Sequence, residues 1–308
     1  MTGAASARAA VARRCKAPGH RRRYQTFAGF GVPALSTHRY ALGVVGTGHI
    51  AAIIVNRLLA SGYLAKDRII VSWSRKLEHH PLPVAAVRDN EDVVRDARIV
   101  MIAVTPQRFA EAAASIRDVI TPDHLVISVM AGVSTDRIAD VLGRGPVRVI
   151  RAMPNLPFGL GCGVTGLFRG RHATADDIEE VKHLFNAGGV TVEVDREALM
   201  DAVTAVAGSG PAYFYYFVEM MMQGGVAAGL RREDAQVLAA HACVGAGAML
   251  LEKGASPSEL REAVTSPGGT TQAAMRTLEK SGVALHVEEA VLAAFRRSQE
   301  LGRLNSGG

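Results

Sequence analysis

Two glycine-rich segments of this 308-residue chain carry residues suited to binding anions. The first, Ser266-Pro267-Gly268-Gly269-Thr270-Thr271, directly precedes a helical pattern that runs to Lys280. The first turn of a helix leaves backbone N–H groups without partners, and the helix dipole adds partial positive charge there. Because glycines remove side-chain bulk and hydroxyls add donors, a small carboxylate can approach closely. The alternative is an ordinary capped helix start after a turn.

The second segment, Gly46-Thr47-Gly48-His49-Ile50-Ala51, follows the apolar run Tyr40–Val45 and opens another helical pattern. A strand, a G-x-G-x-x-A turn and a helix in that order are typical of dinucleotide binding. Gly46 permits the tight turn, and Gly48 lets a pyrophosphate approach the backbone. We therefore expect the cofactor to contact Gly46, Thr47, Gly48, His49 and Ile50.

The end of the next predicted strand, Arg68–Ser72, bears on the choice of cofactor. An NAD site usually places a carboxylate there to bond the ribose 2′-hydroxyl. This chain instead continues with Trp73, Ser74 and Arg75. A hydroxyl and a cation suit a 2′-phosphate, so Ser74 and Arg75 favour NADPH, with NADH still possible. The alternative for Arg75 is a solvated loop charge.

Apolar runs and helical patterns then alternate, which predicts an α/β fold with a doubly wound, mainly parallel sheet. The further strands are expected at Ala97–Val104, His124–Met130, Val147–Ala152, Gly163–Phe168 and Val190–Val194. Ligands of such sheets bind at the carboxyl ends of the strands. The loop residues at those ends that we expect to contact the cofactor are Val104, Thr105, Pro106, Ala131, Gly132 and Asn155.

Strand patterns disappear after Asp195. Helices are predicted at Glu197–Val206, Ala212–Gly229, Glu233–Lys253, Ser256–Val264 and His286–Leu304, with a turn at Gly208–Pro211 that breaks the helical pattern. Helices this apolar would be poorly buried in a lone monomer, which indicates an all-helical dimerisation domain. The expected division is a basic, disordered tail over 1–39, a Rossmann-like NAD(P)-binding domain over 40–196 and a helical substrate and dimerisation domain over 197–308.

The net charge of +6 is concentrated at the start of the chain. Residues 1–40 hold eight basic and no acidic residues, and the remainder has 27 basic against 29 acidic. Neither a nucleic-acid nor a membrane partner is therefore expected. The start of the chain lacks an apolar signal core, so we expect a cytoplasmic protein, although an acid-free, arginine-rich leader is also typical of organellar import.

No metal-site motif and no Ser/His/Asp order stands out, so no metal is expected. The histidines do not indicate acid–base chemistry either. His124, among others, is interpreted as a surface or loop position.

Four segments together resemble the pyrroline-5-carboxylate reductase family. Ala202–Tyr213 and Leu260–Glu279 resemble its two C-terminal signatures, while Ala131-Gly132-Val133 and Arg151–Pro157 resemble its A-G-[IV] and R-x-M-P-N-T-P segments. The match runs from about residue 40 to 304. It implies reduction of a cyclic imino acid, 1-pyrroline-5-carboxylate, to proline with NAD(P)H, the last step of proline synthesis. It also implies a homodimer with intertwined helical domains, often built into a ring of dimers.

The resemblance also implies roles for residues around the first glycine-rich segment. The substrate carboxylate would be held by Ser266, Gly268, Gly269, Thr270 and Thr271. The Thr271 hydroxyl would approach the ring nitrogen, with Ser209, Gly210 and Pro211 beside the same pocket. A cyclic imine is already basic, so a strong general acid is dispensable and orientation of the substrate is the main demand.

The chain departs from the family pattern at several positions. His49-Ile50 stands for Asn-Met and Thr105 for Lys, which bears on cofactor choice. Leu156 stands for Thr and Ala207 for Ser, which bears on the substrate. Alternative functions are therefore reduction of a related cyclic imine or a β-hydroxyacid, or a non-catalytic NADP-binding sensor. The catalytic lysine of β-hydroxyacid enzymes has no convincing counterpart here.

Overall fold

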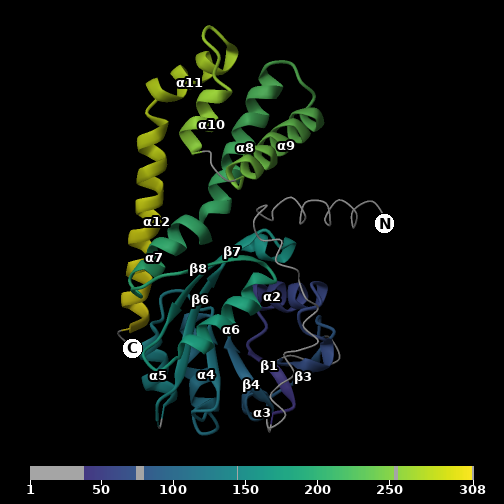
Figure 1. The fold of residues 1–308 in the computed structure, drawn as a ribbon, viewed down its shortest axis with the longest axis vertical. Helices are drawn as coiled ribbons and strands as arrows, with labels where there is room; N and C mark the ends of the chain where they lie inside the picture. Colours follow the sequence, from purple (N-terminus) through teal and green to yellow (C-terminus); the bar gives the residue numbers. More distant parts are fainter. Residues whose placement is uncertain (1–37, 74–79, 144, 253–255, 307–308) are drawn as a thin grey trace. The chain divides into compact units, whose positions relative to one another are not determined.

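The computed structural model describes residues 38–73, 80–143, 145–252 and 256–306 (Figure 1). The described chain forms two compact units. One comprises Ser209–Ala294, and the other comprises the residues before Ser209 together with those from Phe295 onward. No helix in the described ranges combines the length and the apolar character that crossing a membrane requires.

The unit that contains the residues before Ser209 is called the first unit here. It is built on a sheet with eight strands among the residues described, in the order β3-β2-β1-β4-β5-β6-β7-β8. Neighbours from β3 to β6 are parallel, β6 and β7 are antiparallel, and β7 and β8 are parallel. The mainly parallel sheet is therefore confirmed. The strands are β1 (Tyr40–Val45), β2 (Ile69–Ser72), β3 (Ala85–Val87), β4 (Ala97–Ile102), β5 (Leu125–Ser128), β6 (Arg148–Pro154), β7 (Gly163–Arg169) and β8 (Gly189–Glu193).

Helices cover both faces of this sheet, as a doubly wound fold requires. They are α2 (His49–Ala60), α3 (Asn90–Asp96), α4 (Phe109–Ile116), α5 (Thr135–Leu142) and α6 (Ala175–Asn186). Residues of α2 and α6 share one core cluster with Leu42 and Val44 of β1. Residues of α3, α4 and α5 share a second cluster with Tyr40 on the other face. Burial on both faces explains why β1 is a continuous apolar run.

Short elements complete the connections. They are the 3₁₀ turns η1 (Lys66–Arg68), η3 (Pro106–Arg108) and η4 (Leu156–Leu160). Three elements, β3, α3 and α5, were not anticipated from the sequence. β3 has three residues, which is too short to show an alternating pattern. The remaining strands lie along the chain close to the ranges predicted for them.

The prediction that His124 is a surface position was wrong, because its side chain is only 3% exposed. The backbone N–H of Thr121 donates to Nδ1 at 3.0 Å, and Nε2 lies 3.0 Å from the Val94 carbonyl oxygen. Since Nδ1 accepts, Nε2 must carry the proton and donate to Val94. The imidazole therefore ties the loop before β5 to the end of α3.

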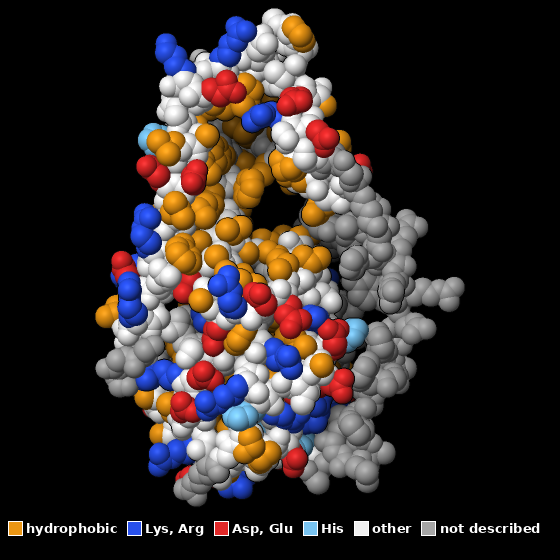
Figure 2. Space-filling model, turned by 60° about the vertical axis from the view of Figure 1, so that its left-hand side comes forward, with side chains coloured by type: hydrophobic (Ala, Val, Ile, Leu, Met, Phe, Trp, Pro, Cys, Tyr) orange, Lys and Arg blue, Asp and Glu red, His pale blue; other side chains and the backbone are white. Residues whose placement is uncertain are grey.

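The helical unit contains α8 (Gly210–Ala227), α9 (Arg232–Leu250), α10 (Pro257–Ala263), α11 (Thr270–Lys280) and the first part of α12 (Val283–Ser306). Its core is thin, and large apolar side chains stay exposed: Phe214, Tyr215 and Tyr216 are 58–61% exposed. Figure 2 shows hydrophobic side chains gathered over these helices. Large aromatic side chains exposed together on one unit are expected of an association surface.

The break that the sequence predicted at Gly208–Pro211 is confined to a bend at Ser209. After α7 (Leu199–Val203), Thr204–Gly208 forms a π-helix, labelled η5. Ser209 keeps helical angles, with φ −83° and ψ −24°, and α8 begins at Gly210. Pro211 lies in the first turn of α8, where its missing N–H would have no partner in any case. The predicted break is therefore present but shorter than expected, and the helix type changes across it.

Candidate active site

The glycine turn after β1 is fixed by contacts to two neighbouring strands. Gly46 has φ +89°, and a Cβ added there would lie 2.7 Å from Val104 Cγ1, so only glycine fits. The Gly46 N–H donates to Ser72 Oγ at 3.0 Å, and Thr47 Oγ1 donates to the Ser72 carbonyl oxygen at 3.1 Å. Ser72 thus holds the turn at the ends of β1 and β2.

The start of α2 is open to an incoming group. Gly48 caps this helix in an extended conformation, and the first turn contains no acidic residue. A Cβ on Gly48 would meet only the Ala103 carbonyl oxygen, at 3.9 Å. Free first-turn N–H groups beside open space fit the pyrophosphate of a dinucleotide.

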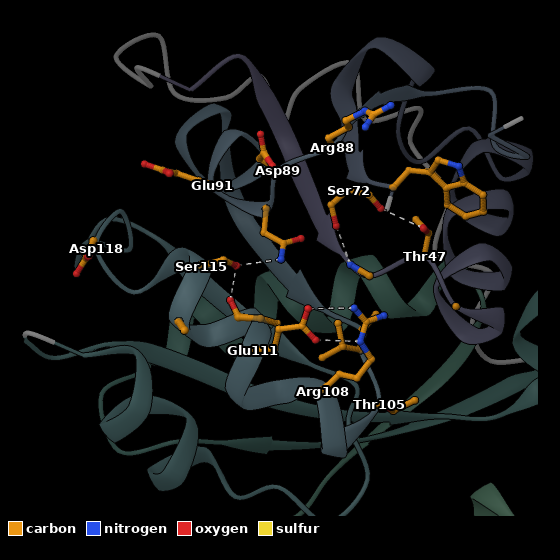
Figure 3. A pocket seen from close by; sticks show the side chains of 18 residues that line it. Thr47, Ser72, Arg88, Asp89, Glu91, Thr105, Arg108, Glu111, Ser115 and Asp118 are labelled. Carbon is orange, nitrogen blue, oxygen red and sulfur yellow. Dashed lines mark hydrogen bonds and ion pairs between the residues drawn. The ribbon is translucent and has the colours of Figure 1, made fainter. Parts of the chain in front are cut away.

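A cavity of about 760 Å³ opens at this point (Figure 3). It lies at the carboxyl ends of β1 to β4 and extends along α4, the edge at which the sequence analysis expects ligands. Its lining residues are Gly46, Thr47, Gly48, Ser72, Trp73, Arg88, Asp89, Asn90, Glu91, Ala103, Val104, Thr105, Arg108, Glu111, Ala112, Ala114, Ser115 and Asp118. Five residues expected to contact the cofactor are therefore in one lining: Gly46, Thr47, Gly48, Val104 and Thr105.

Other expected cofactor residues lie outside this lining or outside the described chain. Ser74 and Arg75 fall outside the described residues. His49 and Ile50 stand at the start of α2 just beyond the open turn, with His49 exposed, and Pro106 begins η3. Their part in cofactor binding stays a prediction.

Gly132, in the loop after β5, packs against the backbone of α12. It has φ +69°, and an added Cβ would lie 2.9 Å from the backbone nitrogen of Gly302 on α12. Nearby, Ser298 Oγ donates to Asp201 Oδ1 at 2.7 Å. The close approach of two glycines therefore seats the last turns of α12 on the loop that carries Ala131 and Gly132.

Asn155, at the end of β6, uses both ends of its side-chain amide inside the fold. Nδ2 donates to the Ala207 carbonyl oxygen at 3.1 Å, and Oδ1 accepts the Val164 N–H at 3.1 Å. The side chain is 8% exposed. Asn155 therefore connects the loop after β6 to the π-helix, a role that the sequence did not indicate.

The loop before α11 has the geometry expected of an anion site. Gly268 has φ +73°, and an added Cβ on Gly269 would lie 2.4 Å from Ser266 Oγ. The Gly268 N–H donates to Gln272 Oε1 at 3.0 Å. α11 begins at Thr270, with Gly269 as its cap, no side-chain cap bond and no acidic residue in its first turn. The N–H groups of this turn are thus available to a carboxylate.

The structure does not bring this loop together with the Ser209-Gly210-Pro211 segment. An added Cβ on Gly210 or Gly268 would meet no heavy atom within 4 Å. Figure 1 also shows α11 at the end of the helical unit away from the start of α8. That both segments line one pocket stays a prediction.

Several residues of the cavity lining were not expected from the sequence, above all Trp73 and Arg88. Arg88 directly follows β3, whose three residues gave no signal of their own. One signal was available: in an alternating α/β fold, a strand is expected between β2 and α3, and the residue after it lies at the ligand edge.

Comparison with known proteins agrees with both parts of the chain. Residues 197–301 match the family model described as pyrroline-5-carboxylate reductase dimerisation. Residues 41–132 match the model described as NADP oxidoreductase, coenzyme F420-dependent. The pyrroline-5-carboxylate reductase of Pisum sativum is 36% identical over 88% of this chain and 98% of its own length. That of Synechocystis sp. is 40% identical over 85% and 98%.

The chain belongs to the pyrroline-5-carboxylate reductase family. This makes it an oxidoreductase with a nicotinamide-binding unit and an association domain. Among solved structures, the Coxiella burnetii reductase matches with a TM-score of 0.79 and 32% identity, over 86% of this chain and 99% of that one. The Plasmodium falciparum reductase, solved with NADP bound, matches with a TM-score of 0.78 and 26% identity, over 87% and 100%. The fold class and the family resemblance are confirmed.

Proposed function

We propose that this family member reduces 1-pyrroline-5-carboxylate to L-proline with NADPH as the preferred hydride donor. The observation that carries the proposal is the presence in one chain of two open helix starts. One, at Gly48, fits a dinucleotide; the other, at Thr270, fits a small carboxylate. Pyrroline-5-carboxylate offers a carboxylate and an imine carbon that accepts hydride, and relatives at 35–40% identity bear the name of this reductase.

The residues of the chain bind and orient the reactants. A bound nicotinamide cofactor supplies the hydride. Gly46, Gly48 and Ser72 shape the turn that would hold its pyrophosphate. The Gly46 N–H donates a hydrogen bond to Ser72 Oγ, and Gly48 leaves open space for the phosphate groups. Asn155 shapes the loop after β6 through its hydrogen bonds to Ala207 and Val164.

On the substrate side, the first-turn N–H groups of α11 and the Ser266 hydroxyl hold the carboxylate. The Thr271 hydroxyl donates an orienting hydrogen bond toward the ring nitrogen. A threonine is a weak acid, so the proton on that nitrogen comes from solvent, and the imine is basic enough to take it before hydride transfer. Orientation of the charged imine then supplies most of the rate enhancement.

We further propose that the working form is a homodimer or a ring of dimers. Two observations support association through the helical unit. Its aromatic residues Phe214, Tyr215 and Tyr216 are exposed, and the start of α8 and the loop before α11 are apart within one chain. A second chain packing on these helices would cover the apolar surface.

The test is oxidation of reduced cofactor by the purified full-length chain with pyrroline-5-carboxylate, followed by nicotinamide absorbance with NADPH and NADH in parallel. Turnover that favours NADPH supports the whole proposal. Turnover that favours NADH keeps the reaction and removes the cofactor preference.

One observation favours a second substrate class. Leu156 replaces the family threonine directly after Asn155 and is 49% exposed. The replacement puts apolar surface where the family pattern has a hydroxyl, so a cyclic imino acid with a more apolar ring is the alternative substrate. A six-membered cyclic imino acid therefore belongs in the same assay, and faster turnover of it than of pyrroline-5-carboxylate would change the substrate assignment.

A further inference from the structure

Arg88 stands where the sheet register places it beside the end of β2. Val87, the last residue of β3, pairs with Ser72, and the Trp73 N–H donates to the Val87 carbonyl oxygen at 2.8 Å. Arg88 therefore leaves the sheet next to Trp73, at the edge where the glycine turn also lies. It lines the same cavity as Gly46 and Thr47.

The other arginines near this cavity are paired, whereas Arg88 is not. Arg95 pairs with Glu91, Arg108 Nε lies 3.3 Å from Glu111 Oε2, and Arg117 Nε lies 3.9 Å from Asp118 Oδ1. Within the described ranges, Arg88 makes no hydrogen bond and no ion pair. Its guanidinium is exposed to solvent at the cavity and remains available to an incoming anion.

The pairing also removes most of the negative charge from the rim. Glu91, Glu111 and Asp118 each face an arginine, so Asp89 is the remaining carboxylate of the lining. Figure 3 shows Arg88 on the side of Ser72, at the end of β2, and Asp89 on the side of Glu91. The group that faces the end of β2 is therefore the cation.

We propose that Arg88 binds the 2′-phosphate of NADP(H) and so sets the preference of this chain for the phosphorylated cofactor. In dinucleotide-binding folds, the adenosine ribose lies at the end of the second strand, where a carboxylate selects NAD and an arginine accommodates NADP. A planar guanidinium can donate two parallel hydrogen bonds to a phosphate. The inference rests on the proposed function only in taking this cavity as the dinucleotide site.

The test measures binding without catalysis. Dissociation constants of adenosine 2′,5′-bisphosphate and of AMP are measured by calorimetry on the full chain and on Arg88→Gln. We expect Arg88→Gln to weaken the bisphosphate by about ten- to a hundredfold, the scale of hydrogen bonds to a charged group, and AMP by about twofold or less. Arg88→Lys should recover part of the loss, because it keeps the charge but not the fork.

A matched control is Arg68→Gln, which removes the same charge at the start of β2, the opposite end of that strand. It should leave both dissociation constants unchanged. Equal weakening of both ligands by Arg88→Gln would overturn the proposal, as would no weakening of either. So would a result in which Arg75→Gln carries the whole discrimination. Failure of the turnover assay would leave these binding ratios intact, so the two proposals fail separately.

Discussion

The Asn155 side-chain amide donates to the Ala207 carbonyl oxygen over 3.1 Å, joining the end of β6 to the π-helix. A π-helix offsets the hydrogen-bond register of the chain, and such segments often occur at functional sites. The same amide holds the Val164 N–H through Oδ1. One buried side chain thus fixes the strand end, the neighbouring strand β7 and the segment that leads into Ser209 and Gly210.

Asn155→Ala is expected to lower the free energy of unfolding by about 1–3 kcal/mol, because it removes two hydrogen bonds in a buried site. Asn155→Asp keeps the acceptor for Val164 and loses the donor to Ala207, so we expect a similar loss above the pKa of the new carboxyl. Urea unfolding measures both. Asn186→Ala, which removes one bond at the end of α6, is a matched control with a smaller loss.

A stable Asn155→Ala variant that binds NADPH poorly would instead make Asn155 a direct cofactor ligand. The sequence analysis assigned it to the cofactor from its position at a strand end. The geometry adds a structural role. Urea unfolding measures the structural role, and NADPH binding measures the cofactor role.

The doubly wound fold was predictable because its strands are buried on both faces. Runs such as Tyr40–Val45 must then be apolar throughout, and Gly46 must follow because the turn needs φ +89°. At the start of α6, the Thr174 side chain accepts the Asp177 N–H in a capping box, which is a local pattern of the same kind. Local rules of periodicity, turns and caps determine these features.

The remaining features depend on contacts between distant residues. The sequence around Gly302 does not indicate that it contacts Gly132. Likewise, no residue near His124 in the sequence indicates that its Nε2 donates a hydrogen bond to the Val94 carbonyl oxygen. The π-helix at Thr204–Gly208 accepts a hydrogen bond from Asn155, about fifty residues earlier. β3 was missed because three residues carry no period, and Arg88 was missed with it.

Alanine substitutions at Gly46 and Gly48 are expected to affect different properties, stability for Gly46 and cofactor binding for Gly48. Gly46→Ala places a Cβ 2.7 Å from Val104 Cγ1 at φ +89°, so it should cost about 1–3 kcal/mol of stability. A Cβ at Gly48 has its nearest contact at 3.9 Å, so Gly48→Ala should stay within about 0.5 kcal/mol of the parent. Because that Cβ occupies the open space, Gly48→Ala should weaken NADPH binding about tenfold or more.

Thermal unfolding and cofactor titration of both variants check this. If Gly48→Ala binds NADPH as tightly as the parent, the pyrophosphate does not approach at this turn.

Alanine substitutions at Gly132 and Gly302, which contact each other, are also expected to have different effects on stability. An alanine at 132 would place Cβ 2.9 Å from the Gly302 nitrogen at φ +69°, and we expect a loss of about 1–3 kcal/mol. An alanine at 302 would place Cβ 3.7 Å from the Gly132 oxygen, an ordinary contact. Since alanine favours a helix over glycine, Gly302→Ala should be neutral or more stable by up to about 1 kcal/mol. Melting temperatures of the two variants test the order; a reversed order would refute the packing described.

Thr271→Ala is expected to lower kcat/KM for pyrroline-5-carboxylate by about ten- to a thousandfold, the scale of one lost oriented donor. Thr271→Ser should retain most of the rate, because it keeps the hydroxyl. Thr277→Ala is the matched control on α11, since its hydroxyl donates to the Ala273 carbonyl oxygen of its own helix. Steady-state kinetics with saturating NADPH distinguish them, and an unchanged rate for Thr271→Ala removes the orienting role.

His124 should make the first unit less stable in mild acid. Burial is the main cause that lowers the pKa of this imidazole below its ordinary value, with His38 adding to it, while the hydrogen bond to Val94 and the charge of Asp123 raise it. The unfolded chain therefore binds a proton more readily than the folded one. Stability present above the unfolded pKa, about 6.5, is lost as the pH falls below that value.

Urea unfolding between neutral pH and about pH 5 measures this slope. His124→Gln should reduce it, at a lower overall stability, because glutamine does not titrate. His286→Gln is the control: that side chain is 70% exposed beside Glu289 on α12, and its loss should leave the slope as in the parent. A slope that His124→Gln leaves unchanged would mean that protonation of other groups destabilises the fold in acid.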